Sequence, residues 1–339
     1  MTTLVALASK DVLVMGTDSL GTVPRPLVDP SDLLAYFDDT NGYRLKLDGQ
    51  GKPLLDDFGK IMDQAQQVPY NQLGNVTKLF DLYPLPMGVM YTGITSIGSR
   101  TIGKMIAAFK EKDAAFASPD PSSNYTVQSL GTRLLEFLHS YYASEYSNPD
   151  GRPDLELLLG GYDHLGYLPD LYRIDIRENT ITKEFDSEEY PFGVAFAGQA
   201  DWIHRIVYGI DFKNWLLLSQ KNYEILQNYR TKIVALLAEA KVDFEVPEPD
   251  AFGEELDLFR ELRLQSLEAD WSEFSEQNAI DCVDFFLDIM IRSQGVSSQL
   301  PTVGGNTHIA VIQKQGFQFV SREEWTHRDH SVRIPGVQQ

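Results

Sequence analysis

Residues 1–22 read MTTLVALASKDVLVMGTDSLGT, and this stretch places a threonine directly after the initiator methionine. If Met1 is removed, Thr2 becomes the first residue and holds both a hydroxyl nucleophile and a free α-amine base. A nucleophile with an adjacent base is the minimum that covalent attack on a carbonyl group requires. The opening of the chain therefore predicts nucleophilic chemistry at Thr2.

The same stretch predicts a β-hairpin. Residues 2–9 and 12–18 are rich in Leu, Val and Ala, and a polar Ser-Lys-Asp turn separates them. In an antiparallel pair, the residue numbers of two facing residues add up to a nearly constant value. Here Ser9 faces Val12 across the turn, so this value is 21. Thr3 then faces Asp18, and Thr2 lies beside this pair. The alternative is an ordinary edge hairpin, in which these side chains are only strand and turn residues.

Further motifs follow in order along the chain. TTLVA opens the sequence at 2–6 and GTDS follows at 16–19; later come NVTKLFDL (75–82), MYTGITS (90–96), LLLGGYD (157–163), LYRID (171–175), VGG (303–305) and HIAVI (308–312). This ordered set resembles the proteasome β-subunit family of N-terminal nucleophile (Ntn) hydrolases, as a divergent bacterial-type member with insertions. The resemblance implies an α+β fold, a four-layer α-β-β-α sandwich with helical insertions. It also implies a threonine-type peptidase or amidohydrolase.

The resemblance assigns roles to individual residues. Thr2 Oγ would attack a peptide or amide carbonyl, and the α-amine of Thr2 would take the proton. An unperturbed α-amine has a pKa of about 7.7–8.0, close to neutral pH. Lys78 would lie near Thr2 as a cation, and Asp18 would hold Lys78 in place and keep it charged. The backbone N–H of Gly93 would stabilise the oxyanion. For Lys78 the alternative is a surface lysine at a strand edge.

Substrate-binding residues are expected beside these catalytic positions. Ser19, Leu20 and Gly21 follow the second predicted strand, and Thr92 and Thr95 flank the predicted oxyanion glycine. These five residues are the predicted walls of the substrate site. The resemblance further implies self-assembly into a homo-oligomeric ring or helical stack, and an ATP-driven unfoldase is a possible partner.

Two departures from the family pattern concern support of the N-terminus. Ala197 stands where the family usually has a serine, in the run AFAGQ at 195–199. No carboxylate precedes the last Gly-Gly strand, where many members have an aspartate. Ser297, Ser298 or Gln199 are candidate substitutes, and the sequence does not choose among them. These two losses favour the main alternative, a catalytically impaired scaffold subunit. A transpeptidase or ligase is a further alternative, which arises if an amine replaces water at the same acyl intermediate.

Composition limits the classes of function. The chain has 339 residues, of which 43% are hydrophobic, and a formal net charge of −20. This acidity argues against a nucleic-acid partner and against an anionic membrane surface. Cys282 is the only cysteine, which excludes an intrachain disulfide and a cysteine metal cluster. With no apolar run of transmembrane length and no secretory signal, we expect a cytoplasmic enzyme without cofactor or metal.

We expect one domain over residues 1–339, elaborated by three segments. Residues 23–74 form an insertion near the active site, with short helices predicted at 31–34 and 54–62. Residues 200–270 form a helical extension, with helices predicted from 200, over 215–240 and over 254–267, and a further helix is predicted over 275–291. Residues 325–339 form a polar tail, whose His327 and His330 are too few for a metal site.

Overall fold

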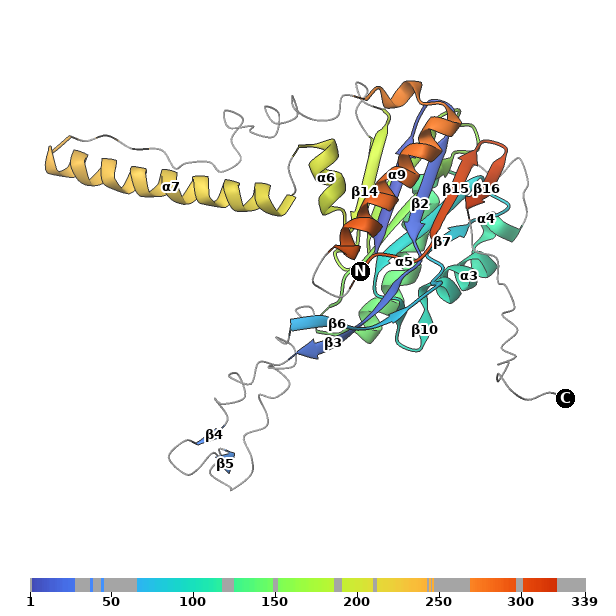
Figure 1. Cartoon of the computed structure of the whole chain (residues 1–339), viewed down its shortest axis with the longest axis horizontal. Helices are drawn as coiled ribbons and strands as arrows, with labels where there is room; N and C mark the ends of the chain where they lie inside the picture. The colour runs from blue at the N-terminus through green and yellow to red at the C-terminus, as the bar shows by residue number, and fades with distance from the viewer. Residues whose placement is uncertain are drawn as a thin grey trace, which may run out of the picture.

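The computed structural model describes residues 2–27, 37–38, 44–45, 66–117, 125–148, 152–185, 191–209, 212–242, 244, 246, 269–296 and 301–321. Within these ranges the chain is a mixed α+β protein with six α-helices, and all of its paired strands are antiparallel. Two sheets of five strands make up its centre (Figure 1). The predicted α+β class is therefore confirmed.

The first hairpin has the predicted register. Strand β1 (Thr3–Ala8) pairs with β2 (Leu13–Asp18), from Leu4 opposite Thr17 to Ala8 opposite Leu13. Ser9 N donates to Val12 O at 2.9 Å and closes the turn. Every residue of both strands is buried, because both faces of this sheet are covered.

The hairpin lies inside the first sheet, whose order is β14-β1-β2-β15-β16. Its other strands are β14 (Gly193–Gly198), β15 (Thr307–Gln313) and β16 (Gly316–Ser321). Gly198 pairs with Thr3, and Thr307 pairs with Asp18. The end of β2 and the start of β1 are thus flanked by segments from the middle and the end of the sequence.

The second sheet has the order β13-β12-β11-β8-β7. Its strands are β7 (Leu79–Asp81), β8 (Met87–Gly93), β11 (Leu155–Tyr162), β12 (Pro169–Asp175) and β13 (Thr180–Lys183). The strand expected over 75–82 is shorter than predicted, and Lys78 immediately precedes it. Asn75 has a left-handed φ of 60°, which keeps this part of the segment out of the sheet.

Three hydrophobic clusters join the elements. One lies between the two sheets and includes Leu4 and Ala6 of β1 with Leu158 of β11. Val5 and Leu7 point to the opposite face of β1, as strand alternation requires. There they belong to a second cluster with α6 (Asp201–Val207) and α9 (Glu276–Gly295). A third cluster joins the second sheet to α3 (Ile102–Lys112) and α5 (Val127–Glu145).

The helical extension begins as predicted, with α6 followed by α7 (Phe212–Glu239). Helix α7 projects away from the sheets (Figure 1). Several of its large apolar side chains are about half exposed or more, including Leu218, Ile225 and Leu236. The predicted helix over 275–291 is α9, whose N-cap Ser275 accepts a hydrogen bond from Asn278 N at 3.3 Å. The helix predicted over 254–267 lies outside the described residues.

In the 23–74 insertion, β3 (Gly21–Leu27) pairs with β6 (Gln66–Leu73), and this ribbon leaves the sheets just after β2 (Figure 1). The predicted helices at 31–34 and 54–62 and the 325–339 tail lie outside the described residues. The remaining short elements are β4 (Phe37–Asp38), β5 (Arg44–Leu45), β9 (Ser96–Ile97), β10 (Arg100–Thr101), α4 (Ala114–Ala117) and the 3-10 turn η4 (Trp271–Glu273).

Candidate active site

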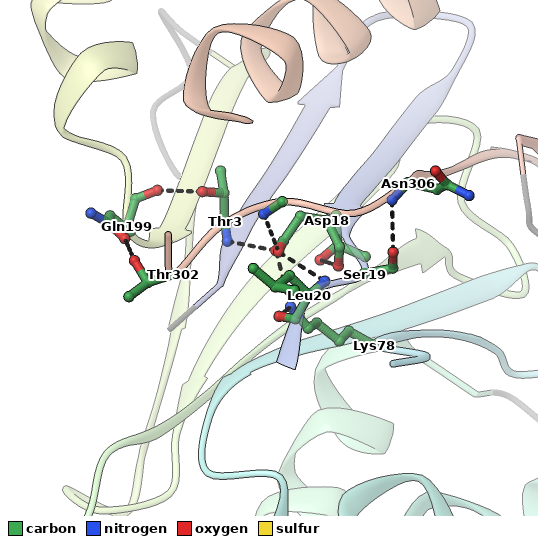
Figure 2. A network of polar contacts seen from close by, with 10 residues as sticks. Thr3, Asp18, Ser19, Leu20, Lys78, Gln199, Thr302 and Asn306 are labelled. Carbon is green, nitrogen blue, oxygen red and sulfur yellow. Dashed lines mark hydrogen bonds and ion pairs between the residues drawn. The ribbon is translucent and has the colours of Figure 1, made fainter. Parts of the chain in front are cut away.

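Asp18 is the centre of the polar network at the end of β2 (Figure 2). Its Oδ1 accepts from Thr3 N at 3.1 Å and from Lys78 Nζ at 3.0 Å. Its Oδ2 accepts from Leu20 N at 3.2 Å and from Gly304 N at 3.1 Å. A carboxylate offers about four acceptor positions, so this fully buried group is saturated by four donors. Asp18 thereby fixes three separate segments of the chain around one point.

Lys78 links the second sheet to this point. Its side chain is 1% exposed, and besides Asp18 it donates to Leu20 O at 2.6 Å. Burial lowers the pKa of the Lys78 ammonium below its ordinary value, while the charge and hydrogen bond of Asp18 act in the opposite direction. The structure therefore brings together the predicted Asp18 and Lys78 as a buried ion pair.

Thr2 directly precedes β1, next to the Thr3 amide that donates to Asp18, and it is 4% exposed. Its carbonyl oxygen accepts from Gln199 N at 2.7 Å, and the adjacent Thr3 Oγ1 donates to Gln199 O at 2.6 Å. The β14 side of the N-terminus is thus held by the backbone of Gln199, and the β2 side by Asp18. Thr2 is positioned by its own bond to Gln199 and by the bond that the next residue, Thr3, makes to Asp18.

Gly198 allows this close approach. Its φ of +73° lies in the left-handed region that favours glycine. A Cβ at this position would overlap Thr2 O and would lie 2.6 Å from Thr92 Oγ1. Thr92 is the penultimate residue of β8, so the second sheet also reaches the backbone next to Thr2. This contact brings the predicted Thr92 to the site.

Gly93 ends β8 directly after Thr92. It is exposed and has a φ of +101°, and a Cβ there would overlap Asp154 O. Ile94 N donates to the same oxygen at 3.0 Å and fixes the turn that follows. A residue with a side chain would be strained at this position. Gly93 thus follows the buried Thr92 directly, in a backbone conformation that favours glycine.

The predicted substrate-binding residues divide into two groups. Ser19 and Gly21 are buried. Ser19 Oγ accepts from Asn306 N at 2.8 Å (Figure 2). Leu20 is partly exposed, and Thr95 is exposed. Ser19 thus holds the loop before β15 in place. Leu20 and Thr95 are the two of the five that present most surface to solvent.

Several residues of this network were not predicted from the sequence as site residues. Gly304 and Asn306 donate through backbone N–H groups, which no side-chain motif reveals. Thr302 was also missed, and its Oγ1 donates to Gln199 Oε1 at 2.6 Å. The only available signal was the proximity of Thr302 to the Val-Gly-Gly motif.

Of the three candidate substitutes for the absent serine and aspartate, the structure describes only Gln199. Gln199 lies next to Thr2, whereas Ser297 and Ser298 lie outside the described residues. Ala197 is buried in the cluster between the two sheets, where a hydroxyl would need a partner. Gln199 is therefore the candidate that the described geometry connects to the N-terminus.

Strand β14 is also fixed from the second sheet. Arg173 of β12 donates from Nη2 to Phe196 O at 2.7 Å and forms ion pairs with Glu156 and Glu184. Burial raises the pKa of the Glu156 carboxyl, and Arg173 acts against this rise. The strand that leads to Gly198 and Gln199 is thus anchored to the sheet that holds Thr92.

In the described part of the chain, no three His, Cys, Asp or Glu residues gather in a way that could hold a metal ion. No helix among the described residues combines the length and apolarity needed to span a membrane. A scan against models of known protein families found no match, and a search of curated proteins found none either.

Proposed function

We propose that this protein is an N-terminal threonine amidohydrolase of the proteasome β-subunit type, active once Met1 has been removed. The observation that supports this most directly is the buried Asp18–Lys78 pair, with Asp18 also bonded to Thr3 N, directly beside Thr2. Burying a charge pair is costly, and an N-terminal strand does not need one in order to pair. The pair is explained if its function is to control the chemistry of Thr2.

In the proposed reaction, Thr2 Oγ attacks the carbonyl carbon of a peptide or amide while the α-amine of Thr2 accepts the hydroxyl proton. The oxyanion is stabilised by the backbone N–H of Gly93. Collapse of this intermediate breaks the C–N bond, and the α-ammonium returns the proton to the leaving amine. Water then attacks the acyl ester, so that the acid product leaves and Thr2 is restored.

Lys78 has an electrostatic role in this mechanism. A positive neighbour favours the neutral form of the α-amine and the ionised form of the hydroxyl. Burial lowers the pKa of Lys78, so Asp18 is required both to hold the ammonium and to preserve its charge. The proposed roles of Asp18 and Lys78 are therefore interdependent.

We further infer that the fold is the four-layer α-β-β-α sandwich of the Ntn hydrolases. This inference is supported by the three clusters, one between the sheets and one between each sheet and its helices. The α3 and α5 helices would form one outer layer, and α6 and α9 the other.

A scaffold subunit without activity is the second candidate, and one observation favours it. Ala197 supplies no hydroxyl at the position where the family usually has a serine, and it points into the core between the sheets. In that case the Asp18–Lys78 pair would be a structural remnant. The two candidates differ in whether Thr2 is reactive.

Intact-protein mass spectrometry with a peptide epoxyketone tests the proposal, because this reagent requires both the hydroxyl and the free amine of an N-terminal threonine. We expect loss of Met1 and an adduct that maps to Thr2. Thr2→Ala should give no adduct, whereas Thr132→Ala, which removes an exposed hydroxyl on α5, should react like the wild type. Retained Met1, or a free Thr2 that never reacts, would refute the enzyme and favour the scaffold.

A further inference from the structure

The N-terminus has a second set of contacts that the proposed mechanism has not used. Gln199 follows β14, and its backbone contacts both of the first two described residues. Gln199 N donates to Thr2 O at 2.7 Å, and Gln199 O accepts from Thr3 Oγ1 at 2.6 Å. A single peptide segment therefore holds the nucleophilic residue and its neighbour.

The side chain of Gln199 is itself held (Figure 2). Thr302 Oγ1 donates to Gln199 Oε1 at 2.6 Å. Thr302 N donates in turn to Gln294 Oε1 at 3.2 Å, and Gln294 lies in the last turn of α9. Thr302 is 5% exposed, so water competes little for its hydroxyl. A continuous set of hydrogen bonds thus runs from α9 through Thr302 and Gln199 to Thr2.

All members of this set are neutral. Asp18, Lys78 and Gly304 hold the other side of the N-terminus through a carboxylate and its donors. A carboxylate beside an α-amine favours the protonated amine, which cannot act as a base. The backbone of Gln199 orients Thr2 through its carbonyl oxygen, and the amide side chain of Gln199 adds no negative charge. The neutral side therefore suits a terminal amine that must stay unprotonated near neutral pH.

We propose that Gln199, held in place by Thr302, is the positioning residue of the N-terminal amine in this protein. The assignment rests on the proposed function and extends it to a pair of residues with no role in the family pattern. Gln199 orients Thr2 through its backbone, and Thr302 keeps that backbone in place by fixing the side chain. Gln199 leaves the α-amine neutral because an amide has no charge.

The charge of this position can be changed without changing its shape. Gln199→Glu keeps an oxygen that accepts from Thr302 Oγ1 but places a negative charge beside the N-terminus. The pKa of the Thr2 α-amine should rise by roughly half a unit to one unit. This pKa is measured by ¹³C NMR on the protein without Met1, after reductive methylation with ¹³C-formaldehyde. The measurement does not depend on enzymatic activity.

The hydroxyl of Thr302 can be removed at constant shape. Thr302→Val should lower the maximal rate of epoxyketone addition about tenfold while reagent affinity changes less than twofold, since positioning and not binding is lost. Thr302→Ser should keep the rate within about twofold. Thr132→Val is the matched control, because its hydroxyl bonds only within α5 in the described structure, at 3.0 Å to Gln128 O.

These outcomes separate the two proposals. If the wild type never reacts with the epoxyketone but Gln199→Glu shifts the α-amine pKa, the proposed function fails and the positioning contact stands. If the wild type reacts but Thr302→Val behaves like Thr132→Val, the positioning role is wrong. An unchanged α-amine pKa in Gln199→Glu would overturn it as well.

Discussion

The two sides of the N-terminal strand β1 are held in different ways. On the β2 side, Asp18 and Lys78 form an ion pair with no more than 1% of either side chain exposed. On the β14 side, the hydrogen bonds that the described residues show for Gln199 and Thr302 join neutral groups. The first side joins the two sheets across the protein, and the second joins β14 to the segment before β15. Both converge on Thr2 and Thr3.

This difference separates control of charge from control of position. A buried ion pair changes the protonation of nearby groups but requires that each charge keep its partner. A neutral hydrogen bond contributes about 1 kcal/mol and leaves nearby pKa values largely unchanged. The arrangement therefore predicts that breaking the charged side has a larger effect on stability than any change on the neutral side.

The largest effect is expected for Asp18→Ala. The substitution removes the acceptor of four donors and leaves the Lys78 ammonium buried without a carboxylate. The free energy of unfolding should fall by about 3–5 kcal/mol, as for other buried pairs that lose one partner. Urea denaturation followed by circular dichroism measures this loss.

An exposed ion pair is the control for this prediction. Asp288 pairs with Arg292 on α9 at 2.6 Å, with side chains 46% and 79% exposed. Asp288→Ala should cost less than about 1 kcal/mol, because water screens the pair. Equal losses for the two alanine variants would contradict the distinction between the buried pair and an ordinary surface pair.

A smaller effect is expected on the neutral side, for Gly198→Ala. The new Cβ would overlap Thr2 O, and the φ of +73° is unfavourable for alanine. We expect a loss of about 1–3 kcal/mol in unfolding free energy together with slower epoxyketone addition at Thr2. Gly74→Ala is the matched control, because nothing lies within 4 Å of its Cβ position. Two variants of equal stability and reactivity would show that β14 does not constrain Thr2.

The charged side could be predicted further from the sequence than the neutral side. Thr3 and Asp18 are 15 residues apart, and the turn between them fixes their register, which the structure confirms. Lys78 is 60 residues from Asp18, and only the resemblance to a known family connected them. Local geometry follows from local sequence, whereas a contact across an insertion does not.

The neutral side depends on distant and featureless residues. Thr302 and Gln199 are 103 residues apart in the sequence. The same problem arises once on the charged side, where Gly304 and Asp18 are 286 residues apart. A single threonine, glutamine or glycine has no recognisable spacing, so these contacts were missed or left open among several candidates. Helix α7 was predicted correctly from its periodicity, but many of its large apolar side chains are exposed. Periodicity indicates which face is apolar and not what covers that face.

The smallest expected effect is a dependence of stability on pH. It measures whether burial or Asp18 has the larger influence on the pKa of Lys78. Burial lowers the pKa of Lys78 below its ordinary value of 10.5. Between the lowered pKa and the ordinary one, the unfolded chain binds a proton that the folded chain has released. The stability contributed by this site therefore rises with pH in that window. Lys78→Met removes the titration, so the stability of the wild type relative to the variant should increase as the pH rises toward the ordinary lysine pKa of 10.5.

The difference between the two proteins is the informative quantity, because other groups titrate nearby. Burial raises the pKa of Tyr91, Tyr142 and Tyr162 to about 12, and these phenols make both proteins less stable as pH rises above their ordinary pKa. Their contributions cancel in the comparison. A difference that shrinks with rising pH would mean that Asp18 stabilises the Lys78 ammonium by more than burial opposes it. The Lys78 ammonium would then keep its charge up to its ordinary pKa. In the proposed mechanism, this cation would persist over the pH range in which the α-amine of Thr2 acts as a base.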